Sequence, residues 1–581
     1  MSNGSVIRKV EIERFRGIES FSWRPDAGTN VLIGGGDVGK STILDAIGLL
    51  LSPTTSVVLS EADYWRREYE REFVIRAVVS LSPETRMSQQ SRQYWPWHWD
   101  GENAVQPSAE QEDQQAVFVF QARGTSGLEI FWEVVQPNGD LDSLPVGLRR
   151  NIGVVRLSSD ERNDRDLRLV YGSALDRLLG DTGLRARINQ ELASINLQDN
   201  LSENAKNSLQ SLDESLANEQ LPHKLELGLT SSQGISIGAL IGLLSEVSEG
   251  VQLPLSSWGS GTRRMASLQI AAASHTETKI NLIDEVERGL EIYRTRKLVK
   301  ALEQEPAQSF LTTHSPAVLS AIDRSTVWYL DSEQNLGALN SKVAKRFQKE
   351  DPETFFAKLT IVCEGVTEIG FLSRLIERAT NLRVEDLGIH LTDAGGNDPA
   401  CRLLKDTTAA GLTFACFVDD DGDSPTVWFG IQQQLGDLFF QWDTSTEKEV
   451  ISSLSSSNLK EILKDSEGIL DGERLRTLAD RLDISNKNIE AIEEALAQSS
   501  KSLKQLVIEA ASGDVSMLPE NGPKKEWRKH GQRWFKTIQG GIELADKMFE
   551  LDCWKDKKEQ LAPFVNAVLR AVGRTKIEDI K

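Results

Sequence analysis

The stretch Ile33–Thr42 (IGGGDVGKST) constrains the fold of this chain more than any other segment. After Gly34 and four further residues come Gly39, Lys40 and Ser41, which is the spacing of a phosphate-binding loop. Such a loop needs glycines because its backbone N–H groups turn inward around the phosphates, where a Cβ would obstruct them. The lysine reaches the terminal phosphates and the serine ligates Mg²⁺. The candidate nucleotide-binding residues of this stretch are Gly34, Gly36, Asp37, Gly39, Lys40, Ser41 and Thr42.

The segments on either side of the loop agree with nucleotide binding. Residues 30–33 (NVLI) predict a short buried strand, and residues 42–50 predict a helix whose N-terminus meets the phosphates. A glycine-rich turn without a ligand is the alternative, and it does not explain a strand before the turn and a helix after it. We therefore expect an α/β domain that binds a nucleoside triphosphate. An antiparallel sheet beside it is predicted from strands at 6–15, 73–81, 116–121 and 128–135, with a loop over 84–114, and residues 151–157 predict another short strand.

Length and composition describe a chain with several hydrophobic cores. At 581 residues it is expected to form roughly three structural units. Hydrophobic residues make up 39% and charged residues 26% of the chain, and no apolar run reaches the ~18 residues that a membrane span needs. The polar start, Met1–Ser5, lacks the apolar core of a signal peptide, so we expect a cytoplasmic protein. The four cysteines form no CxxC pair, which argues against a disulfide framework and a zinc site.

A net charge of −21 argues against a protein coated in positive potential for nucleic acid. A local basic groove can still coexist with an acidic whole, and carboxylates that hold metals also make the net charge negative. The best candidate for such a groove is residues 524–533 (KKEWRKHGQR), with tryptophans at 527 and 534. A solvated helix face explains these charges equally well.

A second glycine-rich segment, residues 256–264 (SSWGSGTRR), opens a helix predicted over 265–273. A serine and two glycines at a helix start can bind an anion. The pattern is weak by itself because many loops contain such triplets. Its candidate residues are Ser257, Gly259, Ser260 and Gly261.

Two apolar strands with polar ends follow this segment. The first, residues 279–285 (KINLIDE), ends in Asp284, expected to hold Mg²⁺ through water, and Glu285, expected to polarise the attacking water. The second begins at residue 309 and ends at His314, which would sense the γ-phosphate. A lone histidine at a strand end is usually structural, so this role depends on the motifs before it.

In this order, the motifs resemble those of ABC-type ATPases of the SMC and RecF kind. In that family ATP lies between two heads, so the resemblance implies at least a dimer. Trp258 and Ser260 depart from the transporter form of the signature. Residues 173–219 carry apolar positions at helical spacing, and we interpret residues 165–250 as a helical insertion in an ATPase domain of residues 1–345. This insertion could serve only to pack against the rest of the domain, and the more specific hypothesis is that it mediates dimerisation.

The second half of the chain predicts a small parallel sheet with acids at its strand ends. Residues 359–363 form an apolar strand followed by Glu364 and Gly365, and residues 412–418 form another, followed by the acidic run 419–423. A third strand is predicted near 388–396. Binding and catalytic residues of such sheets usually lie at the carboxyl ends of the strands. Several carboxylates that converge there need a hard cation such as Mg²⁺ or Mn²⁺ to stay ionised. A solvated turn is the ordinary explanation of an aspartate run, and the Glu-Gly strand argues against it.

This acidic pattern resembles the Toprim domain of topoisomerases, primases and related nucleases. The resemblance implies that Glu364, Asp419 and Asp421 are the core metal ligands, supported by Glu368 and Asp423. Two metals in such a site can activate water and stabilise the leaving oxygen of a cut phosphodiester.

An ABC-type ATPase followed by Toprim resembles the OLD (overcoming lysogenisation defect) nucleases, the family that includes the nuclease of the Gabija antiphage system. The resemblance covers nearly the whole chain and implies a Toprim domain over 355–581 with a helical insertion over 455–512. It also implies a later metal-binding acid and a lysine that stabilises transition-state charge. For the acid we choose Glu449, with Glu447 as rival, and for the lysine Lys536, with Lys547 as rival.

The resemblance implies an ATP-regulated, divalent-metal-dependent DNA endonuclease or nickase of antiphage defence. Its cofactors would be ATP and two Mg²⁺ or Mn²⁺ per nuclease site. Its partners would be DNA, further copies of the chain in a homodimer or a higher oligomer such as a tetramer, and a helicase-like or reverse-transcriptase protein. The alternative is a DNA-repair ATPase of RecF or SMC type whose Toprim module binds or regulates without cleaving. Replacement of Asp419 separates these two functions.

Overall fold

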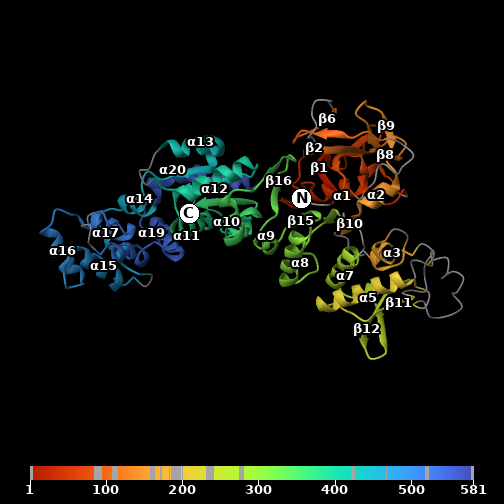
Figure 1. Ribbon diagram of the computed structural model, residues 1–581. Helices are drawn as coiled ribbons and strands as arrows, with labels where there is room; N and C mark the ends of the chain where they lie inside the picture. Colours follow the sequence, from red (N-terminus) through yellow and green to blue (C-terminus); the bar gives the residue numbers. More distant parts are fainter. Residues whose placement is uncertain are drawn as a thin grey trace. The chain divides into compact units, whose positions relative to one another are not determined.

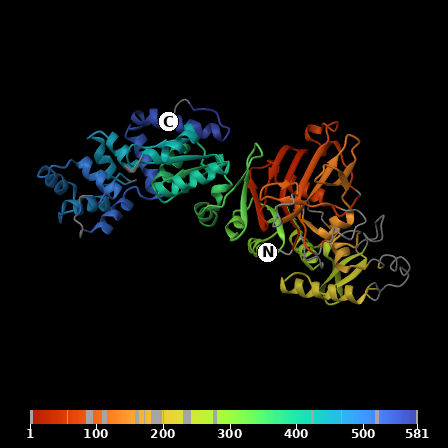
Figure 2. The same ribbon diagram turned by 45° about the horizontal axis from the view of Figure 1, so that its top comes forward.

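The computed structural model of the chain contains two compact units, Met1–Ala338 and Leu339–Lys581 (Figures 1 and 2). Both units combine strands and helices, which confirms the predicted α/β class. The structure describes residues 4–577, except for 56, 84, 86–93, 108–114, 158–163, 171–172, 182–183, 185–197, 199–200, 230–240, 274–279, 421–424, 466–467, 517 and 519–522.

A six-stranded sheet forms the centre of the first unit, in the order β10-β14-β15-β3-β16-β17. The first five of these strands are parallel, and β17 is antiparallel to β16. Every residue of β3, β14 and β15 is buried, as expected for strands that are covered on both faces of the sheet. The strands are β3 (Thr29–Gly34), β10 (Val154–Leu157), β14 (Ile280–Ile283), β15 (Gln308–Thr312), β16 (Thr326–Leu330) and β17 (Leu336–Ala338).

Helices follow three strands of this sheet in the chain. They are α1 (Lys40–Leu50) after β3, α8 (Ile292–Gln304) after β14 and α9 (Pro316–Ala321) after β15. Since parallel strands end at the same edge of a sheet, the residues after β3, β14 and β15 meet there.

A second, antiparallel sheet contains the strands predicted from the N-terminal part of the chain. Its order is β2-β1-β4-β7-β5-β6, with β8 paired to β7 and β9 paired to β8. The loop expected over 84–114 was wrong in its described part, because Trp97–Trp99 pairs with β7 and forms β5. The strands are β1 (Val6–Phe15), β2 (Ile18–Trp23), β4 (Phe73–Ser80), β5 (Trp97–Trp99), β6 (Ala104–Val105), β7 (Gln115–Gly124), β8 (Ile130–Val135) and β9 (Leu141–Ser143).

The strand predicted from residue 151 begins only at Val154. Helix α2 (Val146–Ile152) occupies the preceding residues and ends at Gly153, which has a φ of 67°. A left-handed glycine ends a helix readily, so the chain turns there and enters β10.

The segment predicted as a helical insertion, residues 165–250, is helical only in part. Helices α3 (Ala174–Leu179) and α5 (Glu203–Asn218) are present, and α5 lies beside α7 (Ser260–Ala273) (Figure 1). A three-stranded antiparallel sheet follows, made of β11 (Leu225–Leu229), β12 (Ile241–Ser248) and β13 (Val251–Pro254). The alternating leucines of LELGL at 225–229 are a strand pattern, which corrects the purely helical prediction. Residues Ile188, Leu192 and Ile195, used for that prediction, lie outside the described residues.

The second unit contains a parallel sheet of four strands, in the order β19-β18-β20-β21. These are β18 (Leu359–Cys363), β19 (Ile389–Asp393), β20 (Phe414–Val418) and β21 (Phe439–Gln441). The prediction of three strands missed β21, a short strand after an amphipathic helix. Helices α11 (Val366–Thr380), α12 (Asn397–Ala409) and α13 (Pro425–Leu435) follow β18, β19 and β20 in the chain.

The remaining helices of this unit are mostly in its last third. Helices α15, α16 and α17 form the helical segment predicted over 455–512, and α17 packs on α14 (Figure 1). The helices are α10 (Lys342–Glu350), α14 (Thr446–Ser453), α15 (Gly472–Leu482), α16 (Ile489–Ala497), α17 (Leu503–Ser512), α18 (Lys524–His530), α19 (Ile538–Glu550) and α20 (Trp554–Ala571). Among the described residues, no helix is both long and apolar enough to cross a membrane.

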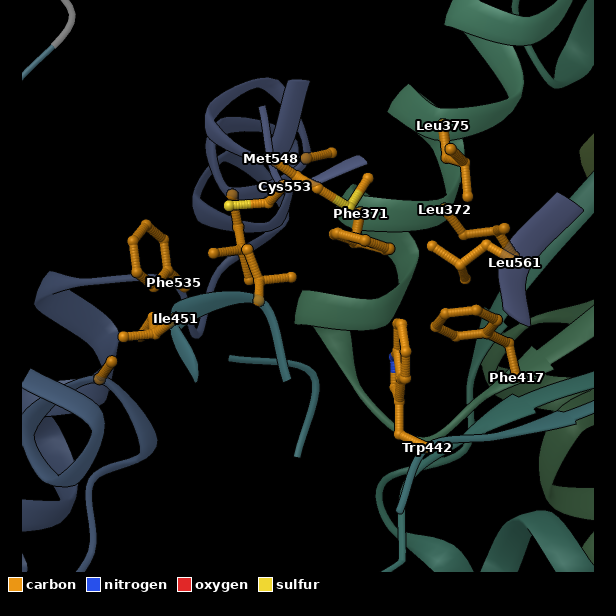
Figure 3. Close-up of a cluster of buried hydrophobic side chains, with 14 of the residues drawn as sticks. Phe371, Leu372, Leu375, Phe417, Trp442, Ile451, Phe535, Met548, Cys553 and Leu561 are labelled. Carbon is orange, nitrogen blue, oxygen red and sulfur yellow. The ribbon is translucent and has the colours of Figure 1, made fainter. Parts of the chain in front are cut away.

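One aromatic and aliphatic core joins the sheet of the second unit to its helices (Figure 3). The ring of Phe417 on β20 stacks on Phe371 of α11 and on Phe440 of β21, with centroid separations of 6.2 and 4.8 Å. Helix α11 also packs closely on α19, because a Cβ added at Gly541 would lie 2.2 Å from Thr367 O. This contact brings the N-terminal ends of α11 and α19 together, beside the end of β18.

Candidate functional site

The phosphate loop has the tight geometry that its sequence predicts. Gly34 ends β3 with a φ of 150°, and a Cβ there would lie 2.3 Å from Leu330 O. Gly39 and Asp37 have φ values of 108° and 57°, in the left-handed region. Helix α1 starts at Lys40, so its free N–H groups face the loop.

Lys40 is held inside the loop. Its Nζ donates hydrogen bonds to Gly34 O at 3.1 Å and to Gly35 O at 2.5 Å. Burial lowers the pKa of Lys40, while Asp284 and Asp37 oppose this shift. A buried ammonium group among backbone N–H donors is suited to a polyphosphate, so these residues fit the binding of ATP.

The predicted Mg²⁺ acid lies against the predicted Mg²⁺ serine. Ser41 Oγ donates a hydrogen bond of 2.9 Å to Asp284 Oδ1, although 243 residues separate the two in the chain. Thr312 Oγ1 donates to the same oxygen at 2.6 Å and accepts from Glu285 N at 2.8 Å. Thr312 therefore holds both acids at the ends of β14 and β15. Glu285 itself has a φ of 46° and forms an ion pair with Arg288 at 3.0 Å.

A third acid, Glu287, positions the histidine loop. Its two carboxylate oxygens accept hydrogen bonds from His314 N at 2.8 Å and from Thr313 Oγ1 at 2.7 Å. The sequence analysis missed Glu287 and Thr312. The signals that could have found them are a third acid soon after Asp284 and the threonine pair just before His314.

The serine-glycine segment, predicted to bind an anion, leads into α7. Helix α7 begins at Ser260, where Gly259 and Ser260 are exposed, while Ser257 Oγ donates to Pro254 O at 2.7 Å. Arg264, in the first turns of α7, donates to Asp284 O. This contact links the helix to the strand that carries the Mg²⁺ acid and leaves the serine-glycine end open to solvent.

In the second unit, two predicted metal ligands meet at neighbouring strand ends. Glu364 follows β18, Asp419 follows β20, and Asp419 N donates to Glu364 Oε2 at 3.3 Å. Gly396 N donates to Glu364 O at 2.8 Å and fixes the backbone after β18. The other two predicted ligands of the aspartate run, Asp421 and Asp423, lie outside the described residues.

Two buried glutamates extend this acidic group. Glu368 on α11 is 5% exposed, and Glu447 on α14 is 2% exposed. Thr446 Oγ1 donates to Glu368 Oε1 at 2.8 Å, and Thr367 Oγ1 donates to Glu447 Oε1 at 3.3 Å. Burial raises the pKa of Glu368 to about 7, and the charges of Glu447 and Asp419 add to the shift. We call Glu364, Glu368, Asp419 and Glu447 the acidic site.

The structure does not support Glu449 as the later metal-binding acid and favours its rival, Glu447. Glu449 forms an ion pair with Lys557 at 2.7 Å and accepts a hydrogen bond from Thr444 at 2.6 Å. Burial opposes ionisation of Glu449, but these partners outweigh it and lower its pKa. Neighbouring positions on one helix turn point in different directions, so Glu447 rather than Glu449 joins Glu368.

Lys536 lies next in the chain to a residue that contacts the acidic site. Thr367 Oγ1, which reaches Glu447, also lies 3.1 Å from Phe535 O. Lys536 is exposed and stands just before α19, whose first turn packs on α11. The rival Lys547 is in the last turn of α19, roughly 15 Å along the helix from its start at 1.5 Å per residue. The structure thus brings Lys536, and not Lys547, to the end of α19 that faces the acidic site.

The acidic site has the donors that a hard divalent cation requires. All four side chains offer carboxylate oxygens, the ligands of Mg²⁺ and Mn²⁺. Burial is the main cause of the raised pKa of Glu368, and the charges of Glu447 and Asp419 raise it further, so a cation beside Glu368 would favour its ionised form. Within the described ranges no three His, Cys, Asp or Glu side chains are close enough to form a complete metal-binding group.

Comparison with known families assigns both units. An AAA domain family, named for the AbiEii toxin of type IV TA systems, matches residues 99–320, and an OLD-like TOPRIM domain matches residues 355–421. The chain therefore combines an AAA ATPase domain with an OLD-like TOPRIM domain, and this combination matches an ATPase–Toprim nuclease of the OLD family. A family of unknown function, DUF2813, also matches residues 5–118. The two domains support ATPase activity and metal-dependent nuclease activity, as predicted.

Solved structures similar to this chain share little sequence with it. The SMC head bound to the C-winged helix domain of ScpA is 11% identical, with a TM-score of 0.38, and the match covers 59% of this chain and 99% of that chain. The Smc head of Pyrococcus furiosus is 10% identical, with a TM-score of 0.37, and the match covers 60% of this chain and 99% of that chain. RecF with ATP is 15% identical, with a TM-score of 0.35, and the match covers 58% of this chain and 99% of that chain. No curated protein sequence gives a significant match.

Proposed function

We propose that this chain is an ATP-regulated, divalent-metal-dependent DNA endonuclease or nickase. The observation that carries the proposal is the acidic site, where Glu364 and Asp419 meet after the ends of β18 and β20 and the buried Glu368 and Glu447 are held by threonines of α14 and α11. Buried acids are costly to ionise without a cation. A site for two Mg²⁺ or Mn²⁺ ions explains why these four side chains are placed together.

Bound divalent ions would supply Lewis-acid chemistry, activating water and offsetting charge on the phosphodiester. Glu364, Asp419, Glu368 and Glu447 would hold the ions, with Asp421 and Asp423 as further candidates. The threonines at 367 and 446 orient two of these carboxylates through the hydrogen bonds described above. Lys536 would reach the phosphate from the start of α19 and stabilise the charge that develops during cleavage.

In the ATPase unit, the phosphate loop and Ser41 would hold ATP and its Mg²⁺ together with Asp284. Glu285 would polarise the attacking water, and His314 would contact the γ-phosphate. The exposed serine-glycine end of α7 supports a dimer in which this end completes the site of a second copy. A tetramer is the higher assembly we propose, together with a role in defence against phage, alone or with a helicase-like or reverse-transcriptase partner.

Cleavage of supercoiled plasmid tests this proposal and the ligand assignment together. The purified chain is incubated with Mg²⁺ or Mn²⁺, with and without ATP, beside the variants Glu447→Gln, Glu449→Gln and Lys40→Ala. We expect Glu447→Gln to abolish cutting, Glu449→Gln to retain it, and Lys40→Ala to remove the difference that ATP makes. The proposal fails if the wild-type chain does not cut DNA under any of these conditions, and the ligand assignment fails if only Glu449→Gln is inactive.

A further inference from the structure

A cavity of about 430 Å³ lies in the helical part of the second unit, apart from the acidic site. One wall comes from α15 and the other from α18 and the turn that follows it. Of the eight residues that line it, four are lysine or arginine and two are acids, so its lining is net positive in a chain whose net charge is −21. The lining residues are Arg476, Thr477, Asp480, Lys525, Glu526, Lys529, His530 and Arg533. We call this cavity the basic pocket.

Two of its lysines are available to a ligand. Lys525 and Lys529 are one helical turn apart on α18, both are exposed, and neither forms an ion pair with any residue that the structure describes. Lysines in this position hold an anion as point charges.

The arginines of the basic pocket are partly engaged by acids. Arg533 pairs with Glu473, and Arg476 lies 3.9 Å from both Glu473 and Asp480. These contacts hold the two arginines at the rim of the pocket, and Lys525 and Lys529 outnumber the one remaining acid of the lining, Glu526, so the pocket keeps a positive charge.

The tryptophans of this segment do not form a surface for stacking bases. Trp534 is 2% exposed, and its Nε1 donates to Thr477 Oγ1 at 2.8 Å. Trp527 lies under the guanidinium of Arg481, at 4.4 Å from its centroid. Neither ring lines the basic pocket, so the pocket offers charge and no aromatic platform. Such a site recognises a phosphate group and not the identity of a base.

His530 supports the same conclusion. It is 4% exposed and stacks on Trp527, and burial lowers its pKa, with the nearby Arg481 adding to this effect. The imidazole is therefore a neutral part of the wall near neutral pH, and the cations of the basic pocket are those of lysine and arginine.

The chain connects this pocket to the acidic site over a short distance. Arg533, on the rim, precedes Lys536 by three residues, so their Cα atoms are at most roughly 11 Å apart at 3.6 Å per residue. DNA advances about 3.4 Å per nucleotide of one strand. A phosphate in the pocket is thus within reach of the same DNA strand whose phosphodiester lies at Lys536.

We propose that the basic pocket binds a backbone phosphate of the DNA substrate, a few nucleotides from the phosphodiester that is cut. The proposal rests on the nuclease function proposed above and adds a second contact that fixes the register of the strand. Free phosphate or a free nucleotide carries the same chemical group, and the experiment distinguishes these sources.

The test is the affinity of the full chain for a duplex DNA as a function of salt, in EDTA so that no DNA is cut. The variant is Lys525→Ala/Lys529→Ala. The control is Lys342→Ala/Lys345→Ala, which removes two exposed lysines from α10 of the same unit. One phosphate contact contributes about 0.9 to the slope of log K against log salt. We expect the pocket variant to lose about one unit of slope and about 8-fold in affinity at 0.1 M salt.

The control should change neither quantity by a comparable amount. Equal losses in both variants would mean that only general charge matters and would overturn the proposal. Unchanged DNA binding by the pocket variant would also overturn it. The same variant is then made in a Lys40→Ala chain, and if it loses binding of ATP or inorganic phosphate but not of DNA, the pocket holds free phosphate and the proposal is overturned. The assay needs no cleavage, so its failure is distinct from failure of the wild-type chain to cut plasmid.

Discussion

Replacing Glu368 by glutamine tests the electrostatic description of the acidic site. The carboxyl of Glu368 has its pKa raised from 4.5 to about 7 by burial and by the charges of Glu447 and Asp419. Since one pKa unit corresponds to about 1.4 kcal/mol, keeping this group ionised at pH 8 costs the folded state about 3 kcal/mol. Glutamine keeps the acceptor for Thr446 and carries no charge. In EDTA at pH 8 the variant should therefore be more stable than the wild-type chain.

The pH dependence follows from the direction of the shift. Because the folded pKa of Glu368 lies above its unfolded value, the wild-type chain loses stability as pH rises from 4.5 to about 7. Thermal unfolding of the full chain at pH 4.5 and pH 8 measures the effect. We expect the difference between variant and wild type to be small at pH 4.5 and to reach roughly 5–10 °C at pH 8. Addition of Mn²⁺ should reverse the ranking, because the wild-type site gains binding free energy that the variant lacks.

Glu449→Gln is the matched control for this experiment. Its pKa is lowered by Lys557 and Thr444 despite burial, so its charge stabilises the folded chain at pH 8, and that stabilisation is lost as pH falls through the folded pKa. The control should lower the melting temperature at pH 8. Equal melting temperatures for Glu368→Gln and the wild-type chain at pH 8 in EDTA would refute the electrostatic reasoning.

Three further predictions concern the other contacts described. Lys40→Ala should reduce ATP hydrolysis at least 100-fold without lowering the melting temperature, measured by phosphate release and calorimetry, and retained hydrolysis would contradict the loop assignment. Glu287→Ala should lower kcat for ATP hydrolysis roughly 10-fold, because the backbone N–H of His314 loses its acceptor. Glu287→Gln keeps an acceptor oxygen and should restore kcat, and failure of this rescue would contradict the positioning role. Gly541→Ala should destabilise the second unit by about 1–3 kcal/mol in urea unfolding, since its Cβ would meet Thr367 O, and unchanged stability would show that α11 and α19 separate easily.

The candidate nucleotide site could be located from the sequence because its residues lie in short local motifs. Gly34, Lys40 and Ser41 lie within one short loop, and buried apolar strands lead to Asp284 and His314. The contacts that hold these groups could not be predicted in the same way. The hydrogen bonds from Thr312 and Glu287 depend on which strands are neighbours, and strand order is not written in any one segment.

The acidic site shows the same division. Glu364 and Asp419 end neighbouring strands, so the strand pattern is enough to bring them together. Glu447 and Glu449 stand on one helix in nearly identical sequence contexts, and only the packing of α14 decides which of them faces Glu368. The sheet over 225–254 was missed for a related reason, because leucine-rich segments fit both a buried helix and a strand.

The most direct test of the nuclease assignment measures plasmid cleavage and ATP hydrolysis on the same preparations of the wild-type chain and Asp419→Asn. The acidic site is in a different unit from the phosphate loop, so the account predicts that Asp419→Asn loses metal-dependent cutting while ATP hydrolysis continues. Cutting by Asp419→Asn at the wild-type rate would contradict the account, because the phosphodiester would then be cleaved at some other site.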